Sequence, residues 1–304
     1  MLQQTRAAVV VPYFLRWMEL FPNVKALYIA PLEQVIKAWE GLGYYSRARG
    51  IHKAAQQIVE EFGGEIPGTK EELQRIYGFG PYTTNAVLSF GFKKRAAPVD
   101  GNVLRVLSRY FCVEENISKG TVRRKIEEKA EGFLDSEEPW ITAEALIELG
   151  ATVCLPKPRC EECPLRGGCL AHQRGRVEIL PIKNEEKKIT ELHRIVWVIE
   201  KNGAVLVKKG MPGKVMADLY EFPYAEEGEE AKFVKGELTF VRKLRPRSHS
   251  FTRFRAHLSP VFLTTQGEAL PGWEWVLISQ LRELPFSSGH RKIAEEICAC
   301  VSCI

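Results

Sequence analysis

Apolar residues in the first half of the chain recur at the spacing of amphipathic helices. One set lies at positions i, i+3, i+4 and i+7, namely Leu32, Val35, Ile36 and Trp39. Their common face predicts a helix that packs inward. We also expect a first helix from about Gln4 to Leu20, and a short helix opened by Thr69 and Glu72, which have the spacing of a capping box. The first half is therefore predicted to be mostly helical.

The second half changes to the patterns typical of strands. Two apolar runs, 195–199 and 204–207, flank Asn202-Gly203, a pair that favours a tight β-hairpin turn. Two more strands and a final helix are expected at 261–265, 273–278 and about 289–300. These elements predict a smaller α/β domain after the helical one.

Length and composition suit two folded domains in a soluble chain. The 304 residues are 45% hydrophobic, yet no apolar run is long enough to cross a membrane. Residues 171–188 are mainly polar and charged, and we interpret them as a linker. The predicted organisation is a helical domain at 1–170, this linker, and an α/β domain at 189–304.

The net charge of +5 is unevenly distributed. No acidic residue occurs between Leu238 and Gly267, although this segment contains six closely spaced basic residues: Arg242, Lys243, Arg245, Arg247, Arg253 and Arg255. A solvated loop would explain such a run. Because the segment also contains Phe251 and Phe254, contact with nucleic acid is favoured.

A glycine hairpin followed by an aspartate lies near the middle of the helical half. Gly78 and Gly80 are separated by one residue, and Pro81 suits the first turn of a helix that we expect to run to Phe90. Free backbone N–H groups at such a turn, with the positive end of the helix dipole, can hold a phosphate. Asp100 opens the next helix, where an ordinary N-cap is the alternative to a catalytic carboxylate.

Four cysteines within sixteen residues form a candidate metal site. Cys154, Cys160, Cys163 and Cys169 follow the pattern C-x5-C-x2-C-x5-C. Thiolates at such spacing bind zinc in some proteins and iron–sulfur clusters in others. Since these cysteines are clustered rather than spread for disulfides, we expect a reducing, cytoplasmic setting.

Several motifs resemble one family of DNA repair enzymes. They are MLQQT (1–5), GLGYYSRAR (41–49), GFGPYT (78–83), VDGNVLRVL (99–107), ALIELGATVC (145–154) and the cysteine loop. In these motifs the chain resembles the helix-hairpin-helix DNA glycosylases with a four-iron four-sulfur cluster, and among them the adenine DNA glycosylases of the MutY family. The resemblance implies a mostly α glycosylase domain with an iron–sulfur loop at 154–169, although the family usually has six residues in the first cysteine spacing.

The second domain resembles the Nudix-like domain that MutY proteins use to recognise 8-oxoguanine. The supporting motif is MADLYEFP (216–223). The chain has no glutamate-rich Nudix box, so we expect no pyrophosphate hydrolysis. The resulting fold class is a helix-hairpin-helix glycosylase domain followed by a smaller α/β Nudix-like domain.

The resemblance assigns catalytic roles around Asp100. Its carboxylate would stabilise the oxocarbenium-like sugar that forms as adenine leaves. Tyr82 occupies the position at which endonuclease III relatives have a lysine that forms a Schiff base, so weak or no lyase activity is expected and Tyr82 would orient the aspartate. Asn102 would support the hairpin side of the site. Glu144 would contact the edge of the flipped adenine or, alternatively, face solvent from its helix.

The general acid of the family matches no residue of the printed sequence. In the family this acid is a glutamate two positions before the methionine of MLQQT, and it protonates the departing adenine. We expect a start upstream of Met1, and the alternative is a lesion-binding protein without catalysis. Gln4 matches the family glutamine that enters the duplex beside the flipped nucleotide, although an ordinary exposed glutamine is the alternative.

Other residues are expected to contact the DNA. The family places the first tyrosine of GLGYY, here Tyr44, beside the lesion base, whereas core packing is the alternative. Arg47 and Arg49 are candidate contacts to phosphate or guanine. The lesion-reading loop of the family has Phe-Ser-His where this chain has Phe251-Thr252-Arg253. Threonine keeps the hydroxyl and arginine changes shape and charge, which predicts recognition of 8-oxoguanine with altered selectivity or salt dependence.

The predicted function is that of a monofunctional adenine DNA glycosylase. It would hydrolyse the N-glycosidic bond of adenine opposite 8-oxoguanine or guanine in base-excision repair. Its expected partner is double-stranded DNA with an A:8-oxoG or A:G mispair. We expect the protein to be a monomer and to bind no membrane. Its expected cofactor is a 4Fe-4S cluster on the four cysteines, and an endonuclease III-like glycosylase and lyase is the rival enzyme.

Overall fold

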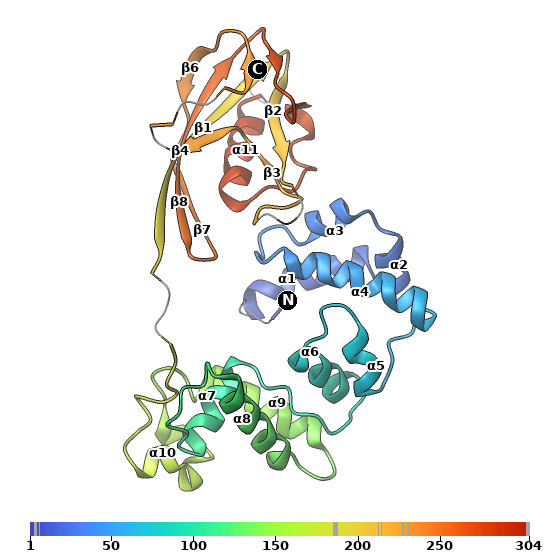
Figure 1. Ribbon diagram of the computed structural model, residues 1–304, viewed down its shortest axis with the longest axis vertical. Helices are drawn as coiled ribbons and strands as arrows, with labels where there is room; N and C mark the ends of the chain where they lie inside the picture. Colours follow the sequence, from blue (N-terminus) through green and yellow to red (C-terminus); the bar gives the residue numbers. More distant parts are fainter. Residues whose placement is uncertain are drawn as a thin grey trace. The chain divides into compact units, whose positions relative to one another are not determined.

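The chain forms two compact units in a computed structural model (Figure 1). Unit 1 comprises Met1–His52 and Lys187–Ile304, and unit 2 comprises Lys53–Glu186. The structure describes residues 1–2, 5, 7–184, 188–211, 213, 215–226, 228–229 and 232–301, so Gln4 lies outside the described residues. No helix in the described ranges is long and apolar enough to cross a membrane.

Unit 1 begins with helices around a group of aromatic rings. They are α1 (Ala7–Leu20), α2 (Val24–Ile29), α3 (Leu32–Ala38) and α4 (Ser46–Phe62), the last of which continues into unit 2. Val35, Ile36 and Trp39 are fully buried, which confirms the predicted inward face. The Trp17 ring of α1 meets the Trp39 ring edge-on, with centroids 5.5 Å apart.

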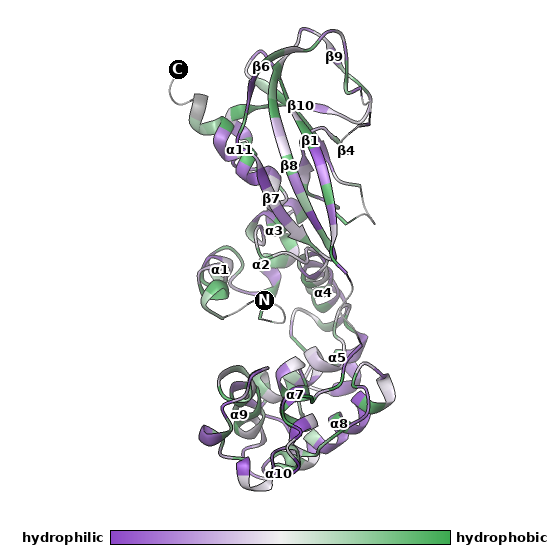
Figure 2. Ribbon diagram, turned by 90° about the vertical axis from the view of Figure 1, so that its left-hand side faces the viewer, coloured by the Kyte–Doolittle hydropathy of each residue, from purple (hydrophilic) through white to green (hydrophobic). Residues whose placement is uncertain are grey.

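A mixed sheet forms most of the remainder of unit 1. Its path is β10 (Glu274–Leu277), β2 (Ala204–Lys209), β1 (Thr190–Lys201), β8 (Phe254–Thr264) and β6 (Thr239–Lys243). β1 and β8 are parallel, and the other neighbours on this path are antiparallel. Asn202 and Gly203 have φ values of 50° and 77°, so the predicted β1–β2 hairpin is confirmed. β1 contains both hydrophilic and hydrophobic residues (Figure 2).

Helix α11 (Ser288–Val301) packs against the apolar core of this sheet. Ile293, Ala294 and Ile297 belong to the same buried cluster as Val196 and Phe286. This element confirms the predicted final helix. The shorter strands are β3 (Tyr220–Glu221), β4 (Tyr224–Glu226), β5 (Val234–Lys235), β7 (Arg247–Phe251) and β9 (Glu268–Ala269).

Unit 2 is organised around α7 (Gly101–Tyr110). The apolar side chains of α7 pack against α8 (Gly120–Phe133) and α9 (Pro139–Thr152) in one core that includes Val103, Leu104, Val106, Leu107, Ile126, Ala130 and Leu146. Burial of a large aliphatic side chain contributes about 1.5–3 kcal/mol. The many such side chains in this core hold α7 firmly in place.

The elements before α7 follow the predicted signals in part. The N–H of Glu72 donates to Oγ1 of Thr69 at 3.4 Å, and the Thr69 hydroxyl donates to the Glu72 carboxylate at 2.5 Å, at the start of α5 (Lys70–Arg75). Thr69 therefore caps the helix as predicted, with the Glu72 carboxylate bonded to the Thr69 hydroxyl. The single helix expected up to Phe90 instead consists of α6 (Pro81–Ala86) and a π-helix, η1 (Val87–Gly91).

Part of the predicted linker packs onto unit 2. Helix α10 (Leu170–Gln173) extends into it, and Ala171 and Leu180 are almost fully buried. The N–H of Ile117 also donates to the carbonyl of Ile182 at 3.0 Å. A few apolar side chains thus anchor a segment whose composition is mainly polar. The predicted domain boundaries stay a prediction.

Candidate active site

Asp100 is the N-cap of α7. Its Oδ1 accepts hydrogen bonds from the backbone N–H groups of Asn102 and Val103, both at 2.8 Å, and its Oδ2 accepts one from Nδ2 of Asn102 at 3.1 Å. The capping role considered as an alternative is therefore present. It does not exclude a catalytic role, because a carboxylate can accept about four hydrogen bonds and these contacts use three. The cap fixes the orientation of a half-buried carboxylate.

Hydrogen bonds connect Asp100 to the first cysteine of the loop. Oδ1 of Asn102 accepts from Nη2 of Arg105 at 2.9 Å. Arg105 also donates from Nε to the carbonyl of Cys154 at 2.7 Å and from Nη2 to the carbonyl of Gly150 at 2.7 Å. The path from the carboxylate to the cysteine loop thus consists of Asn102 and Arg105. The sequence alone indicates no such role for Arg105.

Helices α7 and α9 approach closely at Gly150. A Cβ added at Gly150 would lie 2.6 Å from Cβ of Asn102 and 3.0 Å from its carbonyl carbon. Only glycine fits at that distance without displacing one helix. The close approach keeps Asn102 beside both Asp100 and Arg105.

Tyr82 lies in the first turn of α6 and is electrostatically coupled to Asp100. Burial, and then the negative charge of Asp100, raises the pKa of its phenol above the ordinary value of 10.0. The phenol therefore remains protonated at neutral pH and can donate a hydrogen bond. The Asp100 carboxylate is therefore close enough to influence the Tyr82 phenol, and a shared catalytic site stays a prediction.

The glycine hairpin before α6 contains a glycine with positive φ. Gly78 has φ of 81°, and Gly80 is the N-cap of α6. Gln57 of α4 supports the turn, since its Oε1 accepts from the N–H of Tyr77 at 2.9 Å and its Nε2 donates to the carbonyl of Arg75 at 3.1 Å. Gln57 is an isolated polar residue in a helical pattern, so the sequence does not indicate that it supports this turn.

Glu144 is exposed on α9. The exposure matches the solvent-facing alternative and equally leaves the carboxylate accessible to a bound base. Its predicted contact with adenine stays a prediction.

The four predicted cysteine ligands line one cavity, together with Arg109 and His172. Nη1 of Arg109 donates to Sγ of Cys154 at 3.4 Å. Burial, and then the charges of the other three cysteines, raises the pKa of the Cys160 thiol. In the described part of the chain, no three His, Cys, Asp or Glu side chains are close enough to hold one metal ion. Four thiols around one cavity are a donor set that suits zinc or an iron–sulfur cluster.

In unit 1, Tyr44 is presented on the turn before α4. Its side chain is 52% exposed and its backbone has φ of 48°. The Arg47 guanidinium lies 5.1 Å from the centroid of the Tyr44 ring and 5.6 Å from that of Trp39. Exposure argues against the core-packing alternative, and the neighbouring guanidinium supplies positive charge at an aromatic surface.

Thr252 and Arg253 form the exposed tip of the β7–β8 hairpin, between the paired residues Phe251 and Phe254. Thr252 has φ of 49°, an uncommon conformation for a β-branched residue. The Arg253 guanidinium lies 5.2 Å from the centroid of the Phe254 ring. The two predicted lesion-reading residues are thus presented together to solvent.

The basic residues of 238–267 are less available for contact with nucleic acid than the composition of this segment suggested. Arg247 pairs with Glu296 at 2.7 Å, and Arg255 pairs with Glu191 at 3.2 Å. These carboxylates come from α11 and β1, far away in the sequence, which is why the acid-free segment appeared unpaired. The exposed basic residues left in the segment are Arg242, Lys243, Arg245 and Arg253.

Two family models match the chain in the regions expected. Residues 1–131 match the HhH-GPD superfamily of base excision DNA repair proteins, and residues 194–296 match the NUDIX domain. The adenine DNA glycosylase of Buchnera aphidicola subsp. Acyrthosiphon pisum is 31% identical over 274 residues, which cover 86% of this chain and 77% of that protein. The chain belongs to the adenine DNA glycosylase, or MutY, family.

Other members and solved structures are consistent with this family. The rat (Rattus norvegicus) adenine DNA glycosylase is 42% identical over 186 residues, which cover 60% of this chain but only 36% of the rat protein. The structure of a thermostable thymine-DNA glycosylase is similar to this chain, with a TM-score of 0.51 and 25% identity. The match covers 57% of this chain and 80% of that structure. The match to a non-covalent endonuclease III–DNA complex, with a TM-score of 0.50 and 28% identity, covers 57% of this chain and 79% of that one. The predicted fold class, a helix-hairpin-helix glycosylase domain with a Nudix-like α/β domain, is confirmed.

Proposed function

We propose that this protein is a monofunctional adenine DNA glycosylase that removes adenine paired with 8-oxoguanine or guanine. The observation that supports it most is the fixed carboxylate of Asp100, with the protonated phenol of Tyr82 nearby. A phenol cannot form the imine that a lyase lysine forms. The relatives named adenine DNA glycosylase agree with this assignment over both domains.

Asp100 would act on the sugar rather than on the base. As the N-glycosidic bond breaks, positive charge develops on the deoxyribose, and a carboxylate beside it stabilises that charge. Asn102 and the two backbone N–H groups hold Asp100 in position, so little reorganisation is needed during the reaction. A water molecule then adds to the sugar and completes hydrolysis. The resemblance assigns protonation of adenine to a glutamate.

The DNA partner would be bound through separate elements. The N–H groups of Phe79 and Gly80 donate to the carbonyls of Ile76 and Gly78, both at 3.1 Å, so the phosphate is proposed at the N-terminus of α6 that follows the hairpin. The exposed Tyr44 ring suits stacking in an opened duplex. The Thr252 hydroxyl and the Arg253 charge would contact the base opposite adenine. Gln4 is proposed beside the flipped nucleotide and Glu144 at the edge of the adenine.

A 4Fe-4S cluster is the cofactor that the four cysteines would hold. Its proposed role is to brace the loop that Arg105 and Arg109 connect to α7. A Cys160→Ser chain should contain far less iron and acid-labile sulfide than the unmodified chain, whereas Cys298→Ser, outside the loop, should not. Retention of zinc instead of iron and sulfide after aerobic and anaerobic purification would contradict the cluster. Because these cysteines would bind a cluster instead of forming disulfides, we infer that the protein works in a reducing compartment.

A substrate panel tests the reaction. Duplexes with adenine opposite 8-oxoguanine, guanine or thymine should release adenine in that order of rate, and borohydride should trap little covalent adduct. Efficient trapping would favour the endonuclease III-like lyase. Lesion binding with no adenine release would favour the non-catalytic alternative.

A further inference from the structure

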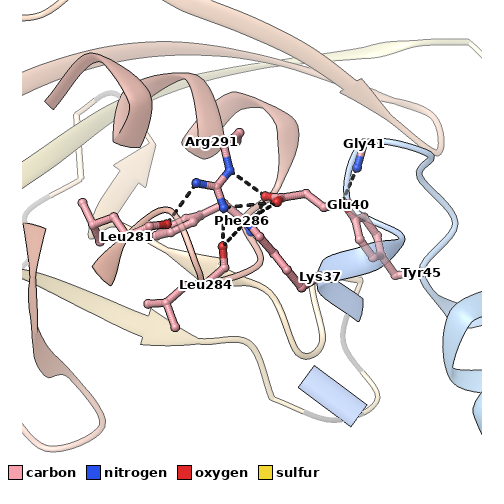
Figure 3. A network of polar contacts seen from close by, with 8 residues as sticks. All are labelled: Lys37, Glu40, Gly41, Tyr45, Leu281, Leu284, Phe286 and Arg291. Carbon is pink, nitrogen blue, oxygen red and sulfur yellow. Dashed lines mark hydrogen bonds and ion pairs between the residues drawn. The ribbon is translucent and has the colours of Figure 1, made fainter. Parts of the chain in front are cut away.

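Four donors surround the carboxylate of Glu40, just after α3 (Figure 3). Its Oε1 accepts from the backbone N–H of Phe286 at 2.8 Å and from Nε of Arg291 at 2.7 Å. Its Oε2 accepts from Nη2 of Arg291 at 3.1 Å and from Nζ of Lys37 at 2.6 Å. The side chains of Glu40 and Arg291 are each only 14% exposed. A carboxylate with this many charged and backbone donors is held in one orientation.

Arg291 is itself fixed by other groups of the Nudix-like domain. It donates from Nη1 to the carbonyl of Leu281 at 2.9 Å and from Nη2 to the carbonyl of Leu284. Its guanidinium lies 5.0 Å from the centroid of the Phe286 ring. The pair with Glu40 therefore joins two well-packed segments of unit 1, and loss of either partner would leave a nearly buried charge without compensation.

A second ion pair connects the same two parts of unit 1. Nη1 of Arg49 lies 3.2 Å from Oδ2 of Asp218 and donates to the carbonyl of Ala217 at 3.1 Å. Asp218 has φ of 64°, and its N–H donates to the carbonyl of Gly210 at 3.0 Å, so its position is set by a tight turn. Arg49 belongs to the GLGYYSRAR motif and Asp218 to MADLYEFP.

These pairs lie on both sides of the Tyr44 turn in the sequence. Glu40 precedes Tyr44 by four residues, and Arg49 follows it by five. Within the turn, Nε1 of Trp39 donates to the carbonyl of Gly43 at 3.0 Å, and the N–H of Arg47 donates to the carbonyl of Tyr44 at 2.8 Å. The turn that presents Tyr44 is thus attached to the Nudix-like domain at its beginning and at its end.

Packed side chains connect Phe286 to the lesion-reading hairpin. The buried Phe286 ring stacks on Phe222, with centroids 5.4 Å apart, and His290 of α11 stacks on the same ring at 5.9 Å. A Cβ added at Gly289 would lie 2.3 Å from Nδ1 of His249 in β7. The start of α11 therefore contacts β7, whose next turn contains Thr252.

We propose that Glu40–Arg291 and Arg49–Asp218 are positioning pairs that determine selectivity for an oxidised purine. They hold the Tyr44 turn and the Thr252 hairpin in one arrangement, so that both engage the base opposite adenine. 8-Oxoguanine differs from guanine by few polar atoms, and discrimination needs donors and acceptors at defined positions. This inference rests on the proposed function, and it assigns no substrate contact to the four residues.

Binding to an uncleavable duplex tests the inference. The probe has 2′-fluoro-2′-deoxyadenosine opposite either 8-oxoguanine or guanine, and fluorescence anisotropy at fixed salt gives both affinities. Glu40→Gln, Arg291→Met and Arg49→Met should each lower the preference for 8-oxoguanine about tenfold, the size of a typical coupling between sites. The double variant of Glu40 and Arg291 should lose no more than the larger single loss. Glu115→Gln, in an exposed pair with Lys125 in unit 2, is the matched control.

Hydrogen exchange provides a second readout that does not depend on the substrate. Amides of residues 41–49 should exchange faster in the three variants than in the control, while unfolding stays cooperative. Arg49 is 29% exposed, so Arg49→Met should fold even if the Glu40 variant does not. Unchanged preference with unchanged exchange in Arg49→Met would overturn the inference. A parent chain without any preference would contradict the proposed function, and the exchange data would still test the positioning.

Discussion

Asn102 donates a hydrogen bond from Nδ2 to Oδ2 of Asp100 at 3.1 Å, while its own Oδ1 accepts one from Arg105. Its orientation is set on both sides, because an amide with these two partners has only one favourable flip. The aspartate therefore has a fixed position before any substrate binds. Such preorganisation is what charge stabilisation in a transition state requires.

Replacement of Asn102 by Ala should slow adenine release about a hundredfold, the cost of a misplaced catalytic group. The backbone cap on Asp100 remains in this variant, so the stability of α7 should change little. Single-turnover rates and the affinity for the uncleavable duplex separate the two effects. Arg124→Gln, on the exposed surface of α8, is the control. A loss confined to DNA affinity would contradict the positioning role.

Substitution of Gly150 by Ala should destabilise the protein by about 1–3 kcal/mol, because the added Cβ overpacks the contact with Asn102. Urea unfolding measures the change. Gly132 in α8 is the matched control, since a Cβ there would meet nothing within 4 Å. Gly132→Ala should be neutral or stabilising, as helix propensity favours alanine. Equal effects at both positions would show that the α7–α9 contact is not tight.

Short-range signals explain what the sequence predicted well. Asn202-Gly203 can adopt positive φ at two consecutive residues, and Thr69 with Glu72 can cap a helix without help from distant residues. Residue type and spacing singled out Asp100 and the four cysteines, which the structure describes as the N-cap of α7 and as the lining of one cavity. The predicted elements agree with the structure where local energetics decide them.

Long-range packing explains what the sequence did not predict. The π-helix after Ala86 and the burial of Leu180 depend on neighbours far along the chain. The pairing of Arg247 with Glu296 could not be inferred from a segment that contains no acid of its own. Arg105 could be recognised only when α7 and the carbonyl of Cys154 were seen together.

Thr252→Gly should raise stability while it weakens lesion recognition. The φ of 49° at this β-branched residue costs on the order of 1–3 kcal/mol, which glycine would relieve. Loss of the hydroxyl should reduce the preference for 8-oxoguanine over guanine. Thermal unfolding and duplex binding measure the two effects. Thr239→Gly, at an exposed position of β6, should destabilise instead, and a stabilisation there as large as at Thr252 would contradict the strain.

Acid should destabilise unit 1 through two histidines. Burial, with Arg194 and Lys292 nearby, lowers the pKa of His249 from 6.5 to about 4, and burial, with His249 and Arg194 nearby, lowers that of His290 to about 3. In the unfolded chain both take up a proton near pH 6.5, before the folded chain does. Stability is therefore full above that pH and falls as the pH drops toward the folded pKa values.

Urea unfolding at several pH values between about 7.5 and 4.5 tests this expectation. In His249→Phe the free energy of unfolding should fall less steeply with decreasing pH than in the parent protein, because phenylalanine binds no proton. The exposed His193 provides the control, and His193→Gln should leave the slope nearly unchanged. A parent-like slope in His249→Phe would assign the acid sensitivity to other groups.

Single-turnover adenine release tests the central claim most directly. The substrate is a duplex with adenine opposite 8-oxoguanine, and the comparison is between the parent protein and its Asp100→Asn variant. We predict release about a thousandfold slower or more in the asparagine variant, with affinity for the uncleavable duplex nearly unchanged. Adenine release at the parent rate by Asp100→Asn would contradict the account.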